Sequence, residues 1–169
     1  MIKIRERDKP ALRPDSMTIY YGHAAIAAVS QSLGRCLTYA ECRVIEEEGF
    51  VDGDYWDTKG ILTSGVGQTG KWRDKSFDET FQAHADRARS RLPDFDGYPE
   101  LLQAELIQSE YRGDLGQSPT AMRLLREGKH EASADEFLNN REYLNPETST
   151  GIKARMRATS DAIREHRLA

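Results

Sequence analysis

The sequence predicts an α+β protein, with a small β unit inserted near the start of a mostly helical chain. Most of the chain places apolar residues at helical spacing between capping residues, glycines and prolines. Residues 50–68 differ, because glycines there separate short runs of β-forming residues. No repeat of fixed period and no low-complexity segment interrupts this pattern.

The N-terminal part is expected to form an arm followed by a helix. About the first fifteen residues alternate basic and acidic groups and contain two prolines, which favours an extended or loosely held segment. Asp15 and Ser16 are candidate caps for a helix that runs to about Leu33, where Gly34 can end it.

The next helix has a stronger start signal. Thr38-Tyr39-Ala40-Glu41 is a capping box, in which the threonine hydroxyl and the glutamate carboxylate each accept from a free backbone amide of the other residue. The helix is expected to end at Glu48, with Gly49 in a left-handed conformation after it.

Beyond Gly49 we expect a hairpin or a small sheet of two or three strands, around Tyr55-Trp56 and Ile61-Leu62-Thr63. A second capping box, Ser76-x-x-Glu79, then opens a helix to about Leu92. Further helices are expected over residues 99–111, 118–128, 131–139 and 151–167. The segment 99–111 has the strongest apolar cluster and is our choice for the centre of the core.

Composition excludes several classes of protein. The 169 residues suffice for one domain with a sizeable core, and a net charge of −4 gives no reason to expect binding to nucleic acid. The most apolar stretch, residues 24–29, is too short to span a membrane, which takes roughly 20 residues, and the N-terminus has no apolar signal segment.

Cys36 and Cys42 are expected to be reduced thiols. The four histidines are scattered, so we expect no metal and no other cofactor.

The acidic run Glu46-Glu47-Glu48 has two interpretations. It can be a solvated helix end. Alternatively, Glu48 is a general acid, because the negative end of the helix dipole and the charges of Glu46 and Glu47 would all raise its pKa. Asp57 and Thr63 follow at spacings that a hairpin can bring opposite Glu48. Two carboxyl groups in unlike environments are what glycoside hydrolysis requires.

The segments E-G-F at 48–50, Y-W-D-T-K-G at 55–60 and T-S-G-V-G at 63–67 form the pattern E-x8-D-x5-T. This pattern resembles the catalytic signature of phage-type lysozymes, the family of endolysins and virion muramidases that includes the T-even phage lysozyme. The resemblance implies that Glu48 is the general acid. It also implies that Asp57 and Thr63 position a water that attacks with inversion.

A weaker resemblance continues through residues 106–140 and through G-I-K-A-R-M-R at 151–157, so that it covers roughly residues 38–167. It implies a lysozyme-like fold in which a β lobe at about 50–72 and a helical lobe at about 76–167 enclose a cleft. Residues 1–37 form an extension outside this catalytic domain of residues 38–169. Where the family often has a histidine, Gln68 stands here, at a position that is usually structural.

Three further residues are candidates for binding the substrate. Trp56 can stack on a sugar ring or pack in the core. Gln108 resembles the amide at the floor of the family's cleft, with a paired core residue as the alternative. Residues 151–157 resemble the family's C-terminal segment, which implies that Arg155 lies near the cleft. The glycine-rich stretch at residues 65–70 does not end in the G-K-[ST] sequence of a phosphate-binding loop, so we expect no phosphate site there. His23 and His84 are expected on the surface.

The function implied by the resemblance is a muramidase that cleaves the β-1,4 bond between N-acetylmuramic acid and N-acetylglucosamine in peptidoglycan glycan strands. We expect a monomeric phage endolysin without nucleic-acid partners or membrane insertion. It would be made in the host cytoplasm and would depend on a holin to reach the cell wall. Two alternatives remain open: a virion-borne lysozyme used at entry, and a wall-binding module without catalysis.

Overall fold

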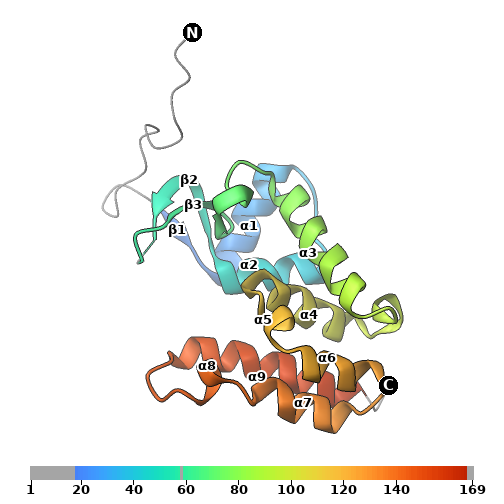
Figure 1. Ribbon diagram of the computed structural model, residues 1–169. Coiled ribbons are helices and arrows are strands. Elements are labelled where there is room, and N and C mark those ends of the chain that lie inside the picture. The colour runs from blue at the N-terminus through green and yellow to red at the C-terminus, as the bar shows by residue number, and fades with distance from the viewer. Residues whose placement is uncertain (1–17, 58, 167–169) are drawn as a thin grey trace.

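The computed structural model describes residues 18–57 and 59–166 and contains a small sheet at one side, with helices beside it and below it (Figure 1). The sheet is antiparallel, with the strand order β1-β2-β3-β4. Its strands are β1 (Ile19–Tyr20), β2 (Phe50–Trp56), β3 (Leu62–Gly65) and β4 (Gln68–Thr69). Two of these strands, β1 and β4, extend the predicted hairpin on either side.

The helices follow the prediction closely, with two short additions. They are α1 (Gly22–Leu33), α2 (Tyr39–Glu48), α3 (Phe77–Arg91), α4 (Glu100–Arg112), α5 (Asp114–Gln117), α6 (Pro119–Arg126), α7 (His130–Leu138), α8 (Arg141–Leu144) and α9 (Thr150–Glu165). The short helices α5 and α8 were not expected. Single turns of 3₁₀ helix lie at Gly70–Trp72 and Phe95–Gly97.

The start of α1 differs from the prediction. Ile19 and Tyr20 were expected inside a helix, but they form β1 and pair with Val51 and Phe50 of β2. The helix begins only at Gly22, because an edge of the sheet is available to satisfy the backbone groups of residues 19–20. The predicted caps, Asp15 and Ser16, lie outside the described residues.

Both predicted capping boxes are confirmed, at the starts of α2 and α3. The end of α2 is also where it was expected, but Gly49 has φ 70° and ψ −176°, which is not the left-handed helical conformation. The extended ψ sends the chain directly into β2. A Cβ at this position would lie 3.0 Å from the carbonyl oxygen of Tyr20, so the close approach of β1 requires glycine here.

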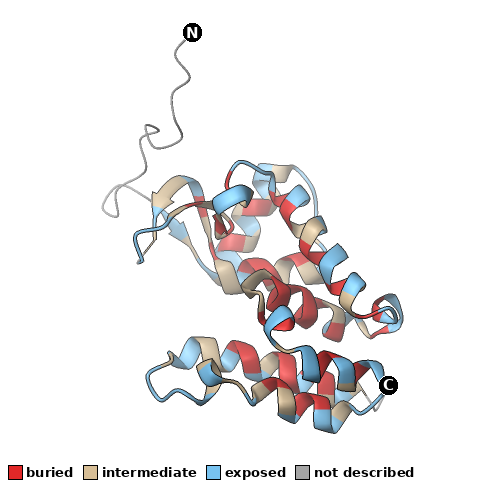
Figure 2. Ribbon diagram, in the orientation of Figure 1, coloured by how far each residue is buried: buried red, intermediate tan, exposed pale blue. Residues whose placement is uncertain are grey.

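The buried helix α4 lies at the centre of the core, as predicted. Every residue from Ala104 to Glu110 is buried, and the helix packs against α2, α3 and α9 (Figure 2). It therefore connects the part that carries the sheet with the C-terminal helices α6 to α9.

α1 also belongs to the packed body. Ala25 and Val29 are buried in the same cluster as Val44 and Ile45 of α2. The sequence placed residues 1–37 in an extension, yet their described part shares the core of the domain. Within the described residues, no helix is long and apolar enough to cross a membrane.

Candidate active site

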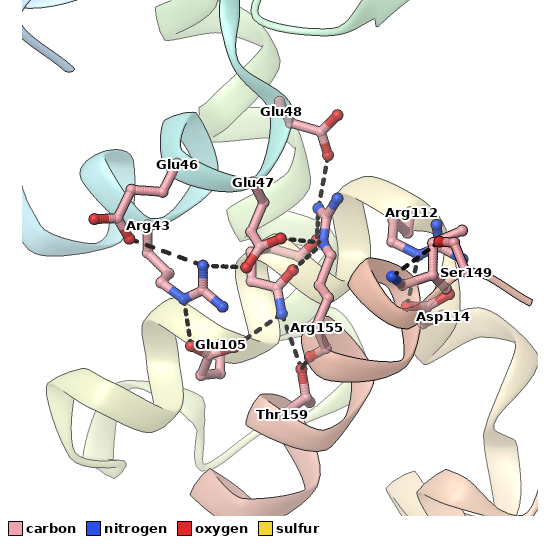
Figure 3. Close-up of polar contacts among 12 residues, drawn as sticks. Arg43, Glu46, Glu47, Glu48, Glu105, Arg112, Asp114, Ser149, Arg155 and Thr159 are labelled. Atoms are coloured by element: carbon pink, nitrogen blue, oxygen red, sulfur yellow. Dashed lines mark hydrogen bonds and ion pairs between the residues drawn. The ribbon is translucent and has the colours of Figure 1, made fainter. Parts of the chain in front are cut away.

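Glu48 is the last residue of α2, and its side chain is held between α9 and the β unit (Figure 3). Its Oε1 accepts a hydrogen bond of 2.6 Å from Nη2 of Arg155 on α9, and 20% of its side chain is exposed. On the other side lies Gly67, where a Cβ would come within 2.6 Å of the carboxylate Oε2. Glu48 is therefore a partly buried, positioned carboxyl group and not a freely solvated helix end.

The two preceding glutamates are not the uncompensated like charges that the sequence suggested. Glu47 forms an ion pair with Arg43, one turn earlier in α2, and its Oε2 lies 3.8 Å from Nε of Arg155. Glu46 is more exposed and lies 3.9 Å from Arg43. Because arginines offset both charges, the acidic run is a network of ion pairs.

Asp57 and Thr63 lie on the hairpin formed by β2 and β3. Oδ1 of Asp57 accepts hydrogen bonds of 2.8 Å from the backbone amides of Lys59 and Ile61, which fix the turn and leave Oδ2 without a partner among the described residues. Thr63 is 3% exposed, and its hydroxyl donates to the carbonyl of Ile61 at 3.0 Å. The oxygen of that hydroxyl can still accept a hydrogen bond.

Tyr55 was not chosen as a site residue from the sequence, although the charges of both candidate carboxyl groups act on it. It pairs across the hairpin with Thr63, and strand alternation places it on the same face as Asp57, two residues later. Burial raises the pKa of the Tyr55 phenol most, and the charges of Asp57 and Glu48 raise it further. Both carboxyl groups are therefore near enough for their charges to act on the phenol. The i, i+2 spacing to Asp57 on a predicted strand was the signal available in the sequence.

Trp56 lies on the opposite face of β2 from Tyr55 and Asp57, because side chains alternate along a strand. Half of it is exposed. The structure does not bring it together with Glu48, and its stacking on a sugar remains a prediction.

Gln108 is fully buried, and its side-chain bonds go to protein groups. Its Nε2 donates to Glu105 and to Thr159, at 2.8 and 2.9 Å, and its Oε1 accepts from Arg155 at 2.5 Å. The interpretation as a paired core residue therefore fits this structure, whereas an amide exposed at the cleft floor does not. Arg155 is 8% exposed and is bound to Gln108 and Glu48, so the structure places it as a support for Glu48.

Gly67, which lies against Glu48, also lines a pocket of about 270 Å³, but Glu48 is not among the residues that line it. His84 forms part of it and is only 5% exposed, so its predicted place on the surface is wrong. Its ring stacks on Tyr111 at 4.1 Å and tilts against Trp72 at 5.0 Å. Burial is the main cause that lowers the pKa of His84. His23 is exposed, as expected.

Gln68 occupies a structural position beside this pocket. It is 6% exposed, and its amide donates to the carbonyl of Lys75 at 2.7 Å and lies 2.9 Å from the hydroxyl of Thr80. These bonds fix β4 to the segment before α3 and to the first turn of α3. Across the described residues, no group of three or more histidine, cysteine, aspartate or glutamate side chains is arranged to hold a metal ion.

No protein-family model and no curated protein matches the sequence. Among solved structures, the active form of the P1 phage endolysin Lyz matches with a TM-score of 0.57 and 13% sequence identity, over 86% of this chain and 95% of that chain. That share is larger than residues 38–169 alone, so the match includes part of the N-terminal segment. At this identity the likeness concerns the fold. The chain therefore has a lysozyme-like α+β fold, in which a small sheet packs against a mainly helical body.

Proposed function

We propose that the protein is a peptidoglycan hydrolase, an N-acetylmuramidase that cleaves the β-1,4 bond between N-acetylmuramic acid and N-acetylglucosamine. The observation that carries this proposal is the partly buried carboxyl group of Glu48, held by Arg155 and lying against Gly67, in the turn that follows the strand of Thr63. The fold shared with a phage endolysin and the resemblance of these residues to the phage-type lysozyme signature support it.

In the proposed reaction, Glu48 protonates the glycosidic oxygen as the bond to the anomeric carbon breaks. A water attacks the same carbon from the opposite face and gives its proton to Asp57. Oδ2 of Asp57, which has no partner among the described residues, and the hydroxyl oxygen of Thr63 can both accept a hydrogen bond. Together they can accept both hydrogens of one water and leave its lone pair directed at the sugar. The product then has an inverted anomeric configuration.

As a biological role we propose host-cell lysis by a phage endolysin of the T-even lysozyme type. The enzyme would be made in the host cytoplasm and would reach the wall after a holin opens the membrane. Its substrate would be the glycan strands of the wall, and no cofactor takes part in the proposed steps.

The test is the substitution Glu48→Gln, which keeps the shape of the side chain but cannot donate a carboxyl proton. We expect turbidity loss of outer-membrane-stripped Gram-negative cells to fall by about 10²-fold or more, the range for loss of a general acid. The matched control is Glu46→Gln, the same change at an exposed site two residues earlier, which should keep activity. Full activity of a folded Glu48→Gln variant would rule out the acid assignment.

Product analysis tests the reaction itself. New reducing ends on muramic acid are expected, whereas glucosamine ends or anhydromuramic ends would identify a glucosaminidase or a lytic transglycosylase. The anomer released first should be the α form. A retained β anomer would contradict the role of Asp57 in holding a water.

A further inference from the structure

Arg155 belongs to a closed ring of hydrogen bonds and ion pairs that joins three helices (Figure 3). The ring runs through Arg43 and Glu47 of α2, Glu105 and Gln108 of α4, and Arg155 of α9. Each member contacts the next, and the chain of contacts returns to its start. The sequence singled out Glu47, Gln108 and Arg155 from this set, but none of them as a member of a network.

Arg43 closes the ring on the side remote from Glu48. Its Nε donates to Oε1 of Glu105 at 2.5 Å, and its Nη1 pairs with Glu47. The arginine side chain is 14% exposed and that of Glu105 is 5% exposed. A fixed guanidinium fork that binds two carboxylates holds both of them in place, which a flexible lysine would do less well.

Glu105 determines which way the amide of Gln108 points. Its Oε2 accepts from Nε2 of Gln108 at 2.8 Å, and a carboxylate at this place can bind only the donor end of the amide. The oxygen end is thereby turned toward Arg155, whose Nε donates to it at 2.5 Å. Because an arginine has only donors, the reversed amide would leave Arg155 facing an NH₂ group.

Arg155 has one nitrogen that leaves the ring toward the site. Its Nε is bound inside the ring, whereas Nη2 bonds both the backbone carbonyl of Gln108, at 2.9 Å, and Oε1 of Glu48, at 2.6 Å. The ring holds the guanidinium plane of Arg155 in place, and the orientation of this plane sets the direction of the bond to Glu48. Two arginines and two glutamates make the ring neutral, so removal of one member leaves a buried charge without its partner.

We propose that Arg43 and Glu105 are positioning residues for Glu48, which act through Gln108 and Arg155 and do not touch the substrate. This inference rests on the proposed muramidase function, which it deepens by naming what sets the orientation of the acid. A purely structural role, in which the ring only fastens α2 to α4, would reduce stability but would not change how Arg155 and Glu48 work together.

A double-substitution cycle separates these two roles. Arg43→Met and Arg155→Met are made singly and together, and kcat and KM are measured on uncross-linked glycan strands. We expect Arg43→Met to lower kcat about tenfold at unchanged KM, and the double variant to be no slower than Arg155→Met alone, because coupled residues are not additive. The proposal would be overturned if the effects of the two single substitutions on kcat multiplied in the double variant, or if only KM changed.

Arg35→Met is the matched control for stability. Arg35 also joins two carboxylates, Glu41 and Asp78, but it does so at the start of α2. We expect it to lower the midpoint of urea unfolding without lowering kcat. An equal fall of kcat in this variant would show that lost stability explains both results, and the positioning role would be rejected.

Glu105→Gln tests the ring by a route that needs no turnover. In ¹⁵N spectra of the wild type, the Nε–H of Arg155, identified by its absence from Arg155→Lys, should exchange slowly with water. Both Arg43→Lys and Glu105→Gln should speed this exchange at least tenfold, and unchanged exchange would refute the ring as a device that holds Arg155. A wild type that leaves glycan strands intact would instead reject the proposed function, whatever the exchange rates are.

Discussion

At the residue scale, the site depends on how closely the β unit approaches the end of α2. Gly67 has φ +58°, and a Cβ there would lie 2.6 Å from Oε2 of Glu48 and 3.3 Å from its Cβ. Any larger residue would both strain the backbone and move the carboxyl group. The glycine that looked like part of a generic turn in the sequence is therefore a contact of the candidate acid.

We predict that Gly67→Ala lowers kcat by at least tenfold, because the added methyl group would come within 2.6 Å of Oε2 of Glu48 and force its side chain to move. Gly128→Ala is the control. Gly128 also has a positive φ, of +72°, but a Cβ there would meet no atom within 4 Å. Both variants should lose about 1 kcal/mol of unfolding free energy, measured by urea denaturation. Equal activity of the two variants would contradict the contact.

The burial of His84 could not be predicted from its neighbours in the sequence. Its flanking residues are polar or small, which favoured the surface. The rings that bury it belong to Trp72 and Tyr111, 12 and 27 positions away in the sequence. Such an environment exists only after α3 packs against α4 and the segment after β4.

At the element scale, local signals predicted helices well wherever a cap fixed the start. Thr38 and Glu41 form their reciprocal bonds at 3.2 and 2.8 Å, and α2 begins where the box requires. The failures are short elements. β1 exists because β2 offers an edge, and α8 is a single turn in which the side chain of Asn140 accepts from the backbone amide of Tyr143.

We predict that Thr38→Ala lowers the free energy of unfolding by about 1 kcal/mol, because an amide at the start of α2 loses its acceptor. Thr120→Ala on the exposed surface of α6 should change it by less than about 0.5 kcal/mol. Urea titrations of both variants provide the measurement. A neutral Thr38→Ala would mean that tertiary packing alone fixes the start of α2.

At the scale of the whole molecule, the burial of His84 and the partial burial of His166 couple folding to pH. The lowered pKa of His84, caused mainly by burial, means that the unfolded chain binds its proton more readily than the folded one. Its contribution to stability is therefore present above the ordinary value of 6.5 and is lost as the pH falls below it. His166, whose pKa is lowered by burial and by the nearby His130, acts in the same direction.

We predict that His84→Phe makes the unfolding free energy less dependent on pH between pH 7.5 and pH 5, because a ring remains in the stack but no longer titrates. The measurement is urea denaturation at several pH values, compared with the wild type. His23→Phe, at an exposed site, should leave the pH dependence unchanged. A steeper loss of stability at acid pH in His84→Phe would reverse the assigned sign.

The sequence by itself determined the fold class, the two capped helices, the hairpin and the spacing of Glu48, Asp57 and Thr63, because these depend on neighbours a few residues apart. Only the tertiary structure decided what surrounds them. Arg155 reaches Glu48 across 107 positions, and Gln108 reaches Arg155 across 47. Which charged groups meet inside a core depends on how α2, α4 and α9 pack together, and this long-range geometry is not encoded in any local pattern.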